Sequence, residues 1–170
     1  MAITESKLDP YWLDEESFKN ILNSVPLVSI DICLVCNGAL LLGKRVNNPL
    51  KGHWFTPGGR LVKNEPWQEG LIRLAKDEIA LQIEIEKFRL MGVWDHIYQD
   101  SVFGPAHTTH YINLPFVGYL DQEPEVHADS QHDCLRWFDL SEIVATHSFH
   151  EYMQSYAKWV MNDSSSRINL

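Results

Sequence analysis

The sequence predicts a single mixed α+β domain, and three features of its 170 residues support this fold class. Apolar and polar residues roughly alternate from 27 to 36, which is the period of a half-buried β-strand. Asn37-Gly38 follows, a pair typical of tight hairpin turns, and 39–45 reads as the returning strand. Pro66 suits the first turn of a helix that runs to about Leu81.

The remaining elements follow from local signals along the chain. An amphipathic helix is expected over 14–24, within an N-terminal helical arm at about 10–25. The later elements are a loop over 47–52, a short strand over 53–56, strands over 88–96 and 107–119 joined by the loop 99–106, a strand over 135–138, and helical sequence over 141–161. The tail from about 163 is expected to be loose. No internal repeat or low-complexity linker interrupts the chain, so residues 1–170 are predicted to form one domain.

Composition excludes two classes of partner. The formal net charge is −9 and no basic stripe is present, so no nucleic acid is expected to bind. No run of about eighteen apolar residues occurs, which predicts no transmembrane helix and no membrane partner. The first 25 residues lack the apolar core of a signal peptide, and a cytoplasmic location is expected.

Cys33 and Cys36 have the C-x-x-C spacing found in some metal and redox sites. They lie in the alternating segment, where residues three apart point to opposite faces of a strand. A buried structural role is therefore expected rather than zinc binding or redox chemistry, and a reducing cytoplasm fits the three cysteines best.

The most informative segment is Gly58-Gly59 together with the helix that follows it. Glycines let main-chain carbonyls approach a cation, and a helix fixes carboxylates beside it. On that helix Leu74, Asp77 and Glu78 share a face, because residues three and four apart are neighbours. The segment is therefore predicted to hold a divalent cation beside a diphosphate.

Residues 59–81 resemble the Nudix box, whose pattern is G-x5-E-x7-R-E-U-x-E-E-x-G-U, with U a bulky aliphatic residue. The positions that keep the pattern are Gly59, Glu65, Arg73, Glu78 and Leu81. Asp77 replaces a glutamate and Ala80 replaces the second glycine, but the important departure is Leu74, which stands where the family has a glutamate. The resemblance implies the Nudix fold, a mixed β-sheet sandwiched between helices.

Loss of that glutamate removes a charged ligand, so one tightly held cation is expected instead of two or three. Among Nudix enzymes the GDP-mannose mannosyl hydrolases look like this, and they attack the sugar carbon instead of phosphorus. The similarity to this subfamily extends over roughly 12–160. It rests on the segments Pro26-Leu27-Val28-Ser29, Leu42-Gly43-Lys44-Arg45, Trp54-Phe55, Pro57-Gly58-Gly59-Arg60, Gly92-Val93-Trp94, Thr108-Thr109-His110-Tyr111 and Gln131-His132-Asp133.

The subfamily resemblance places the cation on the Gly58 carbonyl, the Glu78 carboxylate and the Gln131 side chain. Hard oxygen ligands of this kind suit Mg²⁺, for which Mn²⁺ can substitute. His132 is the candidate base for water, since histidine takes up a proton near neutral pH. Without the resemblance, Glu78 reads as a solvated helix acid, and Gln131 and His132 as ordinary loop residues. Asp77 either adds a water-mediated metal contact or belongs to a solvated face.

Other residues are expected at the substrate. Arg45 and Arg60 would neutralise the departing diphosphate, because a planar guanidinium suits phosphate oxygens; the alternative for both is a surface position. Tyr111 is expected to donate a hydrogen bond to a phosphate oxygen. Asp31 and His96 match positions that line the sugar end in the subfamily and balance charge there, or they are buried groups satisfied by the sheet.

Trp12, Leu13 and Phe18 align with positions that contact guanine in the subfamily, partly across a dimer interface. Stacking of a base on an aromatic ring is physically reasonable, although Phe18 on the apolar face of a helix otherwise reads as core. The resemblance implies a homodimer. It also implies that Arg73 and Glu65 form a structural ion pair that braces the loop against its helix.

The activity implied by the resemblance is Mg²⁺-dependent hydrolysis of GDP-mannose, or GDP-glucose, to GDP and the free sugar. Water would attack the anomeric carbon with inversion, and one base suffices because a neutralised diphosphate leaves readily. One alternative is a pyrophosphatase that releases a nucleoside monophosphate and a sugar 1-phosphate, which Leu74 disfavours. The other is a non-catalytic nucleotide-sugar-binding domain, which has no need of a base such as His132.

Overall fold

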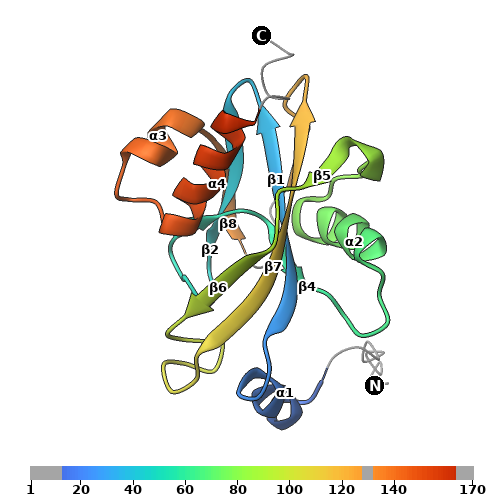
Figure 1. The fold of residues 1–170 in the computed structure, drawn as a ribbon, viewed down its shortest axis with the longest axis vertical. Helices are drawn as coiled ribbons and strands as arrows, with labels where there is room; N and C mark the ends of the chain where they lie inside the picture. Colours follow the sequence, from blue (N-terminus) through green and yellow to red (C-terminus); the bar gives the residue numbers. More distant parts are fainter. Residues whose placement is uncertain (1–12, 128–131, 164–170) are drawn as a thin grey trace, which may run out of the picture.

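The computed structural model describes residues 13–127 and 132–163, and within them a mixed sheet of eight strands lies between helices (Figure 1). This confirms the predicted fold class. Helix α2 lies on one side of the sheet, α3 and α4 lie on the other, and α1 lies at one end near the start of β1. The elements are α1 (Glu15–Leu22), β1 (Leu27–Cys36), β2 (Ala39–Arg45), β3 (Trp54–Phe55), β4 (Gly58–Arg60), α2 (Trp67–Ile79), η1 (Ile85–Lys87), β5 (Phe88–Leu90), β6 (Trp94–Tyr98), β7 (Thr109–Leu120), β8 (His132–Asp139), α3 (Leu140–Ala145) and α4 (Glu151–Asn162).

Strand β1 is the centre of the sheet. It runs parallel to β7 along its whole length and antiparallel to β2 and β4. The strand order is β3-β2-β1-β7-β5, with β8 beside β2 and β6 beside β7. The predicted hairpin turn between β1 and β2 is confirmed, because Asn37 and Gly38 have the positive φ angles, 48° and 76°, that this turn requires.

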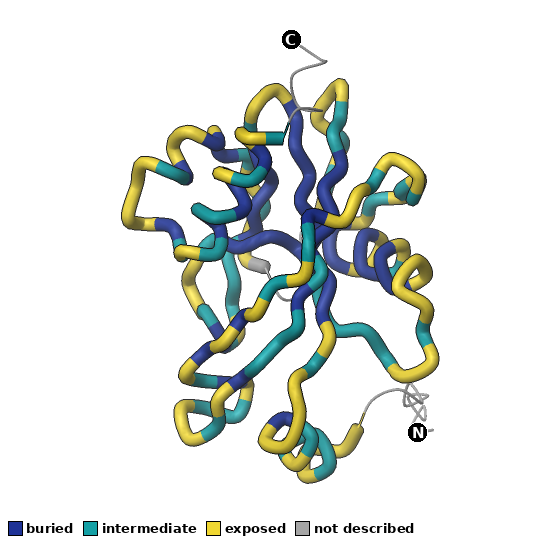
Figure 2. The backbone as a smooth tube through the Cα atoms, viewed as in Figure 1, coloured by how far each residue is buried: buried dark blue, intermediate teal, exposed yellow. Residues whose placement is uncertain are grey.

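Two apolar cores lie on opposite faces of the sheet. Alternation along β1 directs Ile30, Ile32 and Leu34 to the face covered by α2. Cys33 and Val35 point to the other face, which α3 and α4 cover. Both cysteines of the C-x-x-C segment are buried, as expected for a structural role, and Figure 2 shows burial concentrated in the central strands and the inner sides of the helices.

The strand expected over 88–96 is wrong as a single element. It forms two strands, β5 and β6, separated at Gly92, whose φ of 139° interrupts an extended chain and is accessible to glycine. The strand expected over 135–138 is longer than predicted, since β8 already begins at His132.

The helical sequence expected over 141–161 forms two helices in the structure. Helix α3 ends at Ala145, and α4 begins after His150, whose ring accepts a hydrogen bond from the Tyr152 main-chain N–H at 3.3 Å. A side chain that satisfies the first turn of a helix defines its start. The break separates a short α3 from α4, and α4 packs its own apolar side on the sheet.

Strand β4 has no side chains at its first two positions, and the packing requires this. A Cβ on Gly58 would overlap the Ile30 carbonyl oxygen and lie 2.9 Å from Asp31 Oδ1. A Cβ on Gly59 would lie 2.8 Å from Leu74 Cδ2 and 3.9 Å from Glu78 Oε1. The two glycines therefore face opposite sides of the sheet, Gly58 towards Asp31 and Gly59 towards α2.

We expect Gly58→Ala to destabilise the fold more than Gly59→Ala. The first Cβ meets rigid backbone, whereas the second meets the end of the Leu74 side chain, so overpacking should cost roughly 1–3 kcal/mol at Gly59 and more at Gly58. Urea unfolding of both variants measures this. In a Leu74→Ala background the penalty of Gly59→Ala should shrink while that of Gly58→Ala persists; equal penalties in both backgrounds would contradict the packing described.

Candidate functional site

Glu78 lies on the side of α2 that faces β4, which begins with Gly58 and Gly59 and is called the glycine strand below. Its side chain is 5% exposed, and its Oε1 is the polar atom that a Cβ on Gly59 would approach. Asp77 is one residue earlier, with a side chain 56% exposed and 4.0 Å from Arg73. The solvated-face interpretation of Asp77 therefore fits its position, whereas Glu78 is directed inward.

Leu74 occupies the position of the missing box glutamate. It is 3% exposed and belongs to the core between α2 and the sheet, in contact distance of Gly59. Substituting an apolar side chain here fills the space beside the glycine strand with carbon instead of oxygen. Glu78 is left as the helix carboxylate that faces Gly59.

The donor set at this place fits a hard divalent cation. Glu78 offers carboxylate oxygen and Gly58 offers a main-chain carbonyl, both of the kind that Mg²⁺ prefers. The third predicted ligand, Gln131, lies outside the described residues. Within 13–127 and 132–163, no three side chains of His, Cys, Asp or Glu gather closely enough to hold a metal ion, so a cation here would need carbonyl or amide oxygen as predicted.

The Arg73–Glu65 pair holds the loop before α2. Arg73 Nε and Nη2 donate to the two oxygens of Glu65 at 2.6 and 2.8 Å, and Glu65 also accepts from the Val62 N–H at 3.1 Å. The hydrogen bond from Arg73 lowers the pKa of Glu65. Arg73 Nη2 further donates to the Arg60 carbonyl at 3.0 Å, so this ion pair, as predicted, braces the chain between β4 and α2.

Arg60 and Tyr111 lie together at the end of the sheet near α1. Arg60 follows the glycines in β4, and its guanidinium carbon lies 4.0 Å from the centre of the Phe18 ring. Burial lowers the pKa of Arg60 and raises that of Tyr111, and the charge of Arg60 partly offsets the latter shift. Phe18 is half-buried and also contacts Phe103, with ring centres 5.4 Å apart, so α1 is fixed to this end of the sheet.

Arg45 ends β2, where its Nε donates to the Pro49 carbonyl at 2.9 Å. Its positive charge acts on both Asp31 and Tyr111. Arg45 pairs with His132 of β8 across the sheet, so the backbone of the predicted base lies beside the predicted phosphate ligand. Two cationic side chains, from β2 and β4, thus act on one tyrosine.

Asp31 is buried on the face covered by α4. Its Oδ2 accepts hydrogen bonds from Asn113 Nδ2 at 2.6 Å and from the Tyr156 hydroxyl at 2.9 Å. Asn113 is itself held by Ser29, whose hydroxyl donates to Asn113 Oδ1 at 2.8 Å. Burial raises the pKa of Asp31 to about 6, although these hydrogen bonds and Arg45 oppose the shift.

His96 is the second titratable group of this network. Its ring is 2% exposed and stacks on Tyr152, with centres 3.9 Å apart and planes 9° from parallel. The Tyr156 hydroxyl lies 3.2 Å from Nε2, and the Tyr98 hydroxyl lies 3.3 Å from Nδ1. Burial lowers the pKa of His96 to about 3, so the ring is neutral at physiological pH.

Asp31 and His96 are therefore buried groups with partners on the sheet and on α4. Four of these partners were not predicted from the sequence: Tyr98, Asn113, Tyr152 and Tyr156. The signals were weak, because a polar residue in a strand and two tyrosines one helical turn apart are common features. The structure gives them significance through contacts between distant parts of the chain.

Four predicted residues lie outside the described residues or are described there only in part. Trp12 and Gln131 lie outside the described residues. For His132 the structure places the main chain in β8. Leu13 lies before α1 and is 49% exposed.

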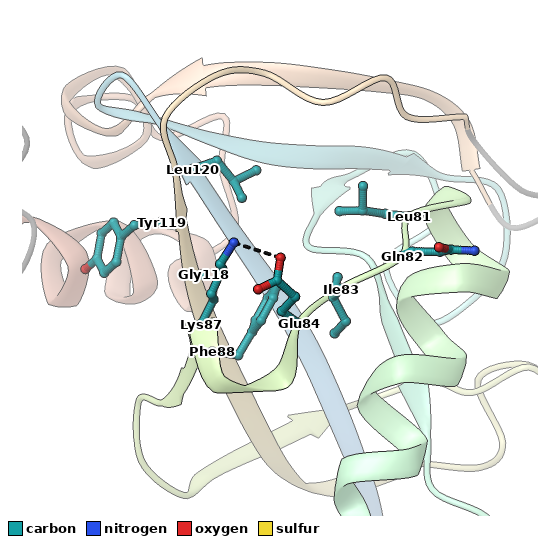
Figure 3. A pocket seen from close by; sticks show the side chains of 9 residues that line it. All are labelled: Leu81, Gln82, Ile83, Glu84, Lys87, Phe88, Gly118, Tyr119 and Leu120. Carbon is teal, nitrogen blue, oxygen red and sulfur yellow. Dashed lines mark hydrogen bonds and ion pairs between the residues drawn. The ribbon is translucent and has the colours of Figure 1, made fainter.

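Two pockets lie away from these residues. One, of about 100 Å³, is at the C-terminal end of α2, where Leu81, Ile83, Phe88 and the Glu84–Lys87 ion pair line it (Figure 3). The other, of about 350 Å³, lies between Trp67 of α2 and strands β5 and β7. Neither is lined by a predicted site residue.

The mixed sheet between helices and the glycine strand that faces Glu78 are the features of one family of hydrolases. The family model described as NUDIX domain matches residues 26–160. The chain belongs to this family. No helix in the described parts of the chain is long and apolar enough to span a bilayer.

Two relatives and one solved structure show the range of similarity. The low-salt glycan biosynthesis protein Agl8 of Haloferax volcanii is 32% identical over 144 residues, which are 85% of this chain and 88% of that protein. An ADP-ribose pyrophosphatase of Methanocaldococcus jannaschii is 29% identical over 136 residues, 79% of this chain and 75% of that protein. The crystal structure of a MutT NUDIX hydrolase from Burkholderia pseudomallei has a TM-score of 0.65 at 25% identity, covering 80% of this chain and 98% of that one.

The pKa shifts of Asp31 and His96 predict opposite pH dependences of stability. The pKa of His96 is 6.5 in the unfolded chain and about 3 in the folded protein. Between pH 4 and 6 the unfolded chain therefore binds a proton on His96 that the folded protein does not, and acid destabilises the fold. The pKa of Asp31 is 3.8 in the unfolded chain and about 6 in the folded protein. In the same pH range the folded protein therefore binds a proton on Asp31 that the unfolded chain does not, and acid stabilises the fold.

The two effects should largely cancel in the native protein. Substitution of either residue should therefore reveal the pH dependence that the other residue causes. Relative to the native protein, Asp31→Asn should lose about 1.4 kcal/mol of unfolding free energy per pH unit on acidification from 6 to 4, and His96→Gln should gain a similar amount. Urea unfolding with a chelator present measures both. Curves that stay parallel to that of the native protein would contradict these pKa shifts.

Proposed function

We propose that this Nudix hydrolase is a Mg²⁺-dependent GDP-mannose mannosyl hydrolase that releases GDP and the free sugar by water attack at the anomeric carbon. The observation that carries the proposal is Leu74. It is packed in the core beside Gly59, where the family's box has a glutamate, while Glu78 keeps its place at the glycine strand. Such a site is suited to one cation that assists a leaving group.

The charges around Tyr111 support departure of a diphosphate. When bound at Gly58, Glu78 and Gln131, Mg²⁺ would supply positive charge to the leaving group. Arg45 and Arg60 add two guanidinium groups that act on the same tyrosine, which carries a hydroxyl donor for a phosphate oxygen. The rigidity of Arg60 comes from the Arg73 bond to its carbonyl and from the Phe18 ring.

The proposed base is His132, in β8 opposite Arg45. His96 is less suited to take a proton from water, because both of its ring nitrogens face hydroxyl groups of the protein and its pKa lies near 3. Trp12, Leu13 and Phe18 are proposed to lie near guanine in a homodimer. The Phe18 ring that stacks with Arg60 links this end of the site to the diphosphate end.

The relatives support the substrate class from two directions. One is named for glycan biosynthesis, a process that consumes nucleotide sugars, and we propose a nucleotide sugar as substrate here as well. The other is named an ADP-ribose pyrophosphatase, which makes cleavage at phosphorus the second candidate. The apolar Leu74 favours attack at carbon over this alternative.

Product analysis in ¹⁸O-water tests the proposal. With GDP-mannose and Mg²⁺ we expect unlabelled GDP, and early ¹H NMR spectra should show the β-anomer of mannose as the first sugar formed, because inversion of the α-linked substrate gives it. The pyrophosphatase reaction would instead give GMP and mannose 1-phosphate, one of them labelled. Either labelled phosphate or an absence of turnover would reject the proposal.

Glu78→Gln and Asp77→Asn form a matched pair for the cation site. Removing the charge of the inward Glu78 should reduce kcat by roughly 100-fold or more and abolish tight Mn²⁺ binding in an EPR titration. The same change at the exposed Asp77 should alter kcat by less than about 3-fold. Equal effects of the two substitutions would place the cation elsewhere.

A further inference from the structure

In the polar network between the sheet and α4, counting the available protons assigns the donor and the acceptor of each hydrogen bond. The Tyr156 hydroxyl has one proton, and it lies within hydrogen-bond distance of Asp31 Oδ2, Asn113 Nδ2 and His96 Nε2. A carboxylate can only accept, so Tyr156 donates its proton to Asp31. An amide nitrogen can only donate, so Asn113 donates to the Tyr156 oxygen at 2.6 Å.

This assignment determines the proton on His96. Since the hydroxyl proton of Tyr156 is already engaged with Asp31, the contact of 3.2 Å to His96 Nε2 requires an N–H on that nitrogen. The other ring nitrogen, Nδ1, lies 3.3 Å from the Tyr98 hydroxyl, which can donate to it. Asn113 Nδ2 is equally near to Nδ1, but its two protons are engaged with Asp31 and Tyr156. The burial that lowers the pKa of His96 agrees with a neutral ring that has one donor and one acceptor.

We propose that Tyr156 of α4 is a positioning residue of the site, which orients Asp31 and His96 through a directed relay from His96 Nε2–H to the Tyr156 hydroxyl to Asp31 Oδ2. Both hydrogen bonds from Tyr156 and Asn113 end on Oδ2, which leaves Oδ1 on the side of Gly58. Tyr156 thus acts on the glycine strand through Asp31. Its ring is completely buried, so a direct contact with substrate is not part of this role.

Other charged and titratable groups surround the relay without replacing it. The charge of Arg45 of β2 opposes the rise in the pKa of Asp31. The charge of Asp31 adds to the effect of burial in raising the pKa values of Tyr98 of β6 and Tyr111 of β7. Among the described residues none of these three makes a hydrogen bond to Asp31, whereas the Tyr156 hydroxyl lies 2.9 Å from Oδ2. The hydroxyl of Tyr156 is therefore the group that connects Asp31 to His96 Nε2.

Histidine ¹⁵N NMR tests the relay directly in the full chain. Long-range ¹H–¹⁵N correlation distinguishes the two neutral tautomers, and among the eight histidines the His96 signals are assigned by their loss in His96→Gln. We expect His96 protonated at Nε2 and unprotonated at Nδ1 at neutral pH. Protonation at Nδ1, or at both nitrogens, would overturn the relay even if Tyr156 could not be substituted without unfolding.

Tyr156→Phe provides the second arm, because it keeps the buried ring and removes the hydroxyl. We expect the Nε2 proton of His96 to exchange with water about 10-fold faster or more, and kcat to fall by about 10-fold with KM changed by less than about 2-fold. Tyr119→Phe is the matched control, since its hydroxyl donates to Asp163 at 2.6 Å on another part of the sheet; it should change neither readout.

Unchanged exchange and unchanged kcat in Tyr156→Phe would overturn the positioning role. Equal effects of Tyr156→Phe and Tyr119→Phe would also overturn it. The kinetic readout rests on the proposed function, but the tautomer and exchange readouts do not. If GDP-mannose is not hydrolysed, these two measurements still decide whether the relay exists.

Discussion

The absence of side chains at Gly58 and Gly59 is the constraint on which the site depends. Two consecutive residues of a strand face opposite sides of a sheet, and here each side is filled by another element. The Asp31 carboxylate and the Ile30 carbonyl occupy one side, and Leu74 with Glu78 occupies the other. A strand that begins with two glycines fits between them, and this brings the buried carboxylate of α2 next to Gly59.

That arrangement divides the site between the two cores. The α2 core supplies the inward carboxylate of Glu78. The ion pair between Arg73 and Glu65 holds the preceding loop to the helix. The α4 core supplies the hydrogen-bonded network around Asp31 and His96. Arg45 and Arg60 act on Tyr111, and under the proposed function these three residues would bind the diphosphate.

The sequence predicted those features that depend on local pattern. The hairpin at Asn37-Gly38 and the helix after Pro66 follow from spacings of a few residues, whereas the bracing of Glu65 by Arg73 was implied by the Nudix resemblance. The break at Gly92 was missed because a glycine within an apolar run is compatible with both a continuous and an interrupted strand. Asn113 and Tyr156 were missed for a different reason: their significance lies in contacts with Asp31 across 82 and 125 residues, which no local periodicity encodes.

The span between Asp31 and Tyr156 also has a consequence for synthesis of the protein on the ribosome. Strand β1 emerges early, but its buried carboxylate receives the hydroxyl of α4 only after a further 125 residues have been translated. At about 5–20 residues per second this interval lasts roughly 6–25 s. During that time a polar group destined for the interior stays hydrated, which delays closure of the second core and makes the nascent chain dependent on its last helix.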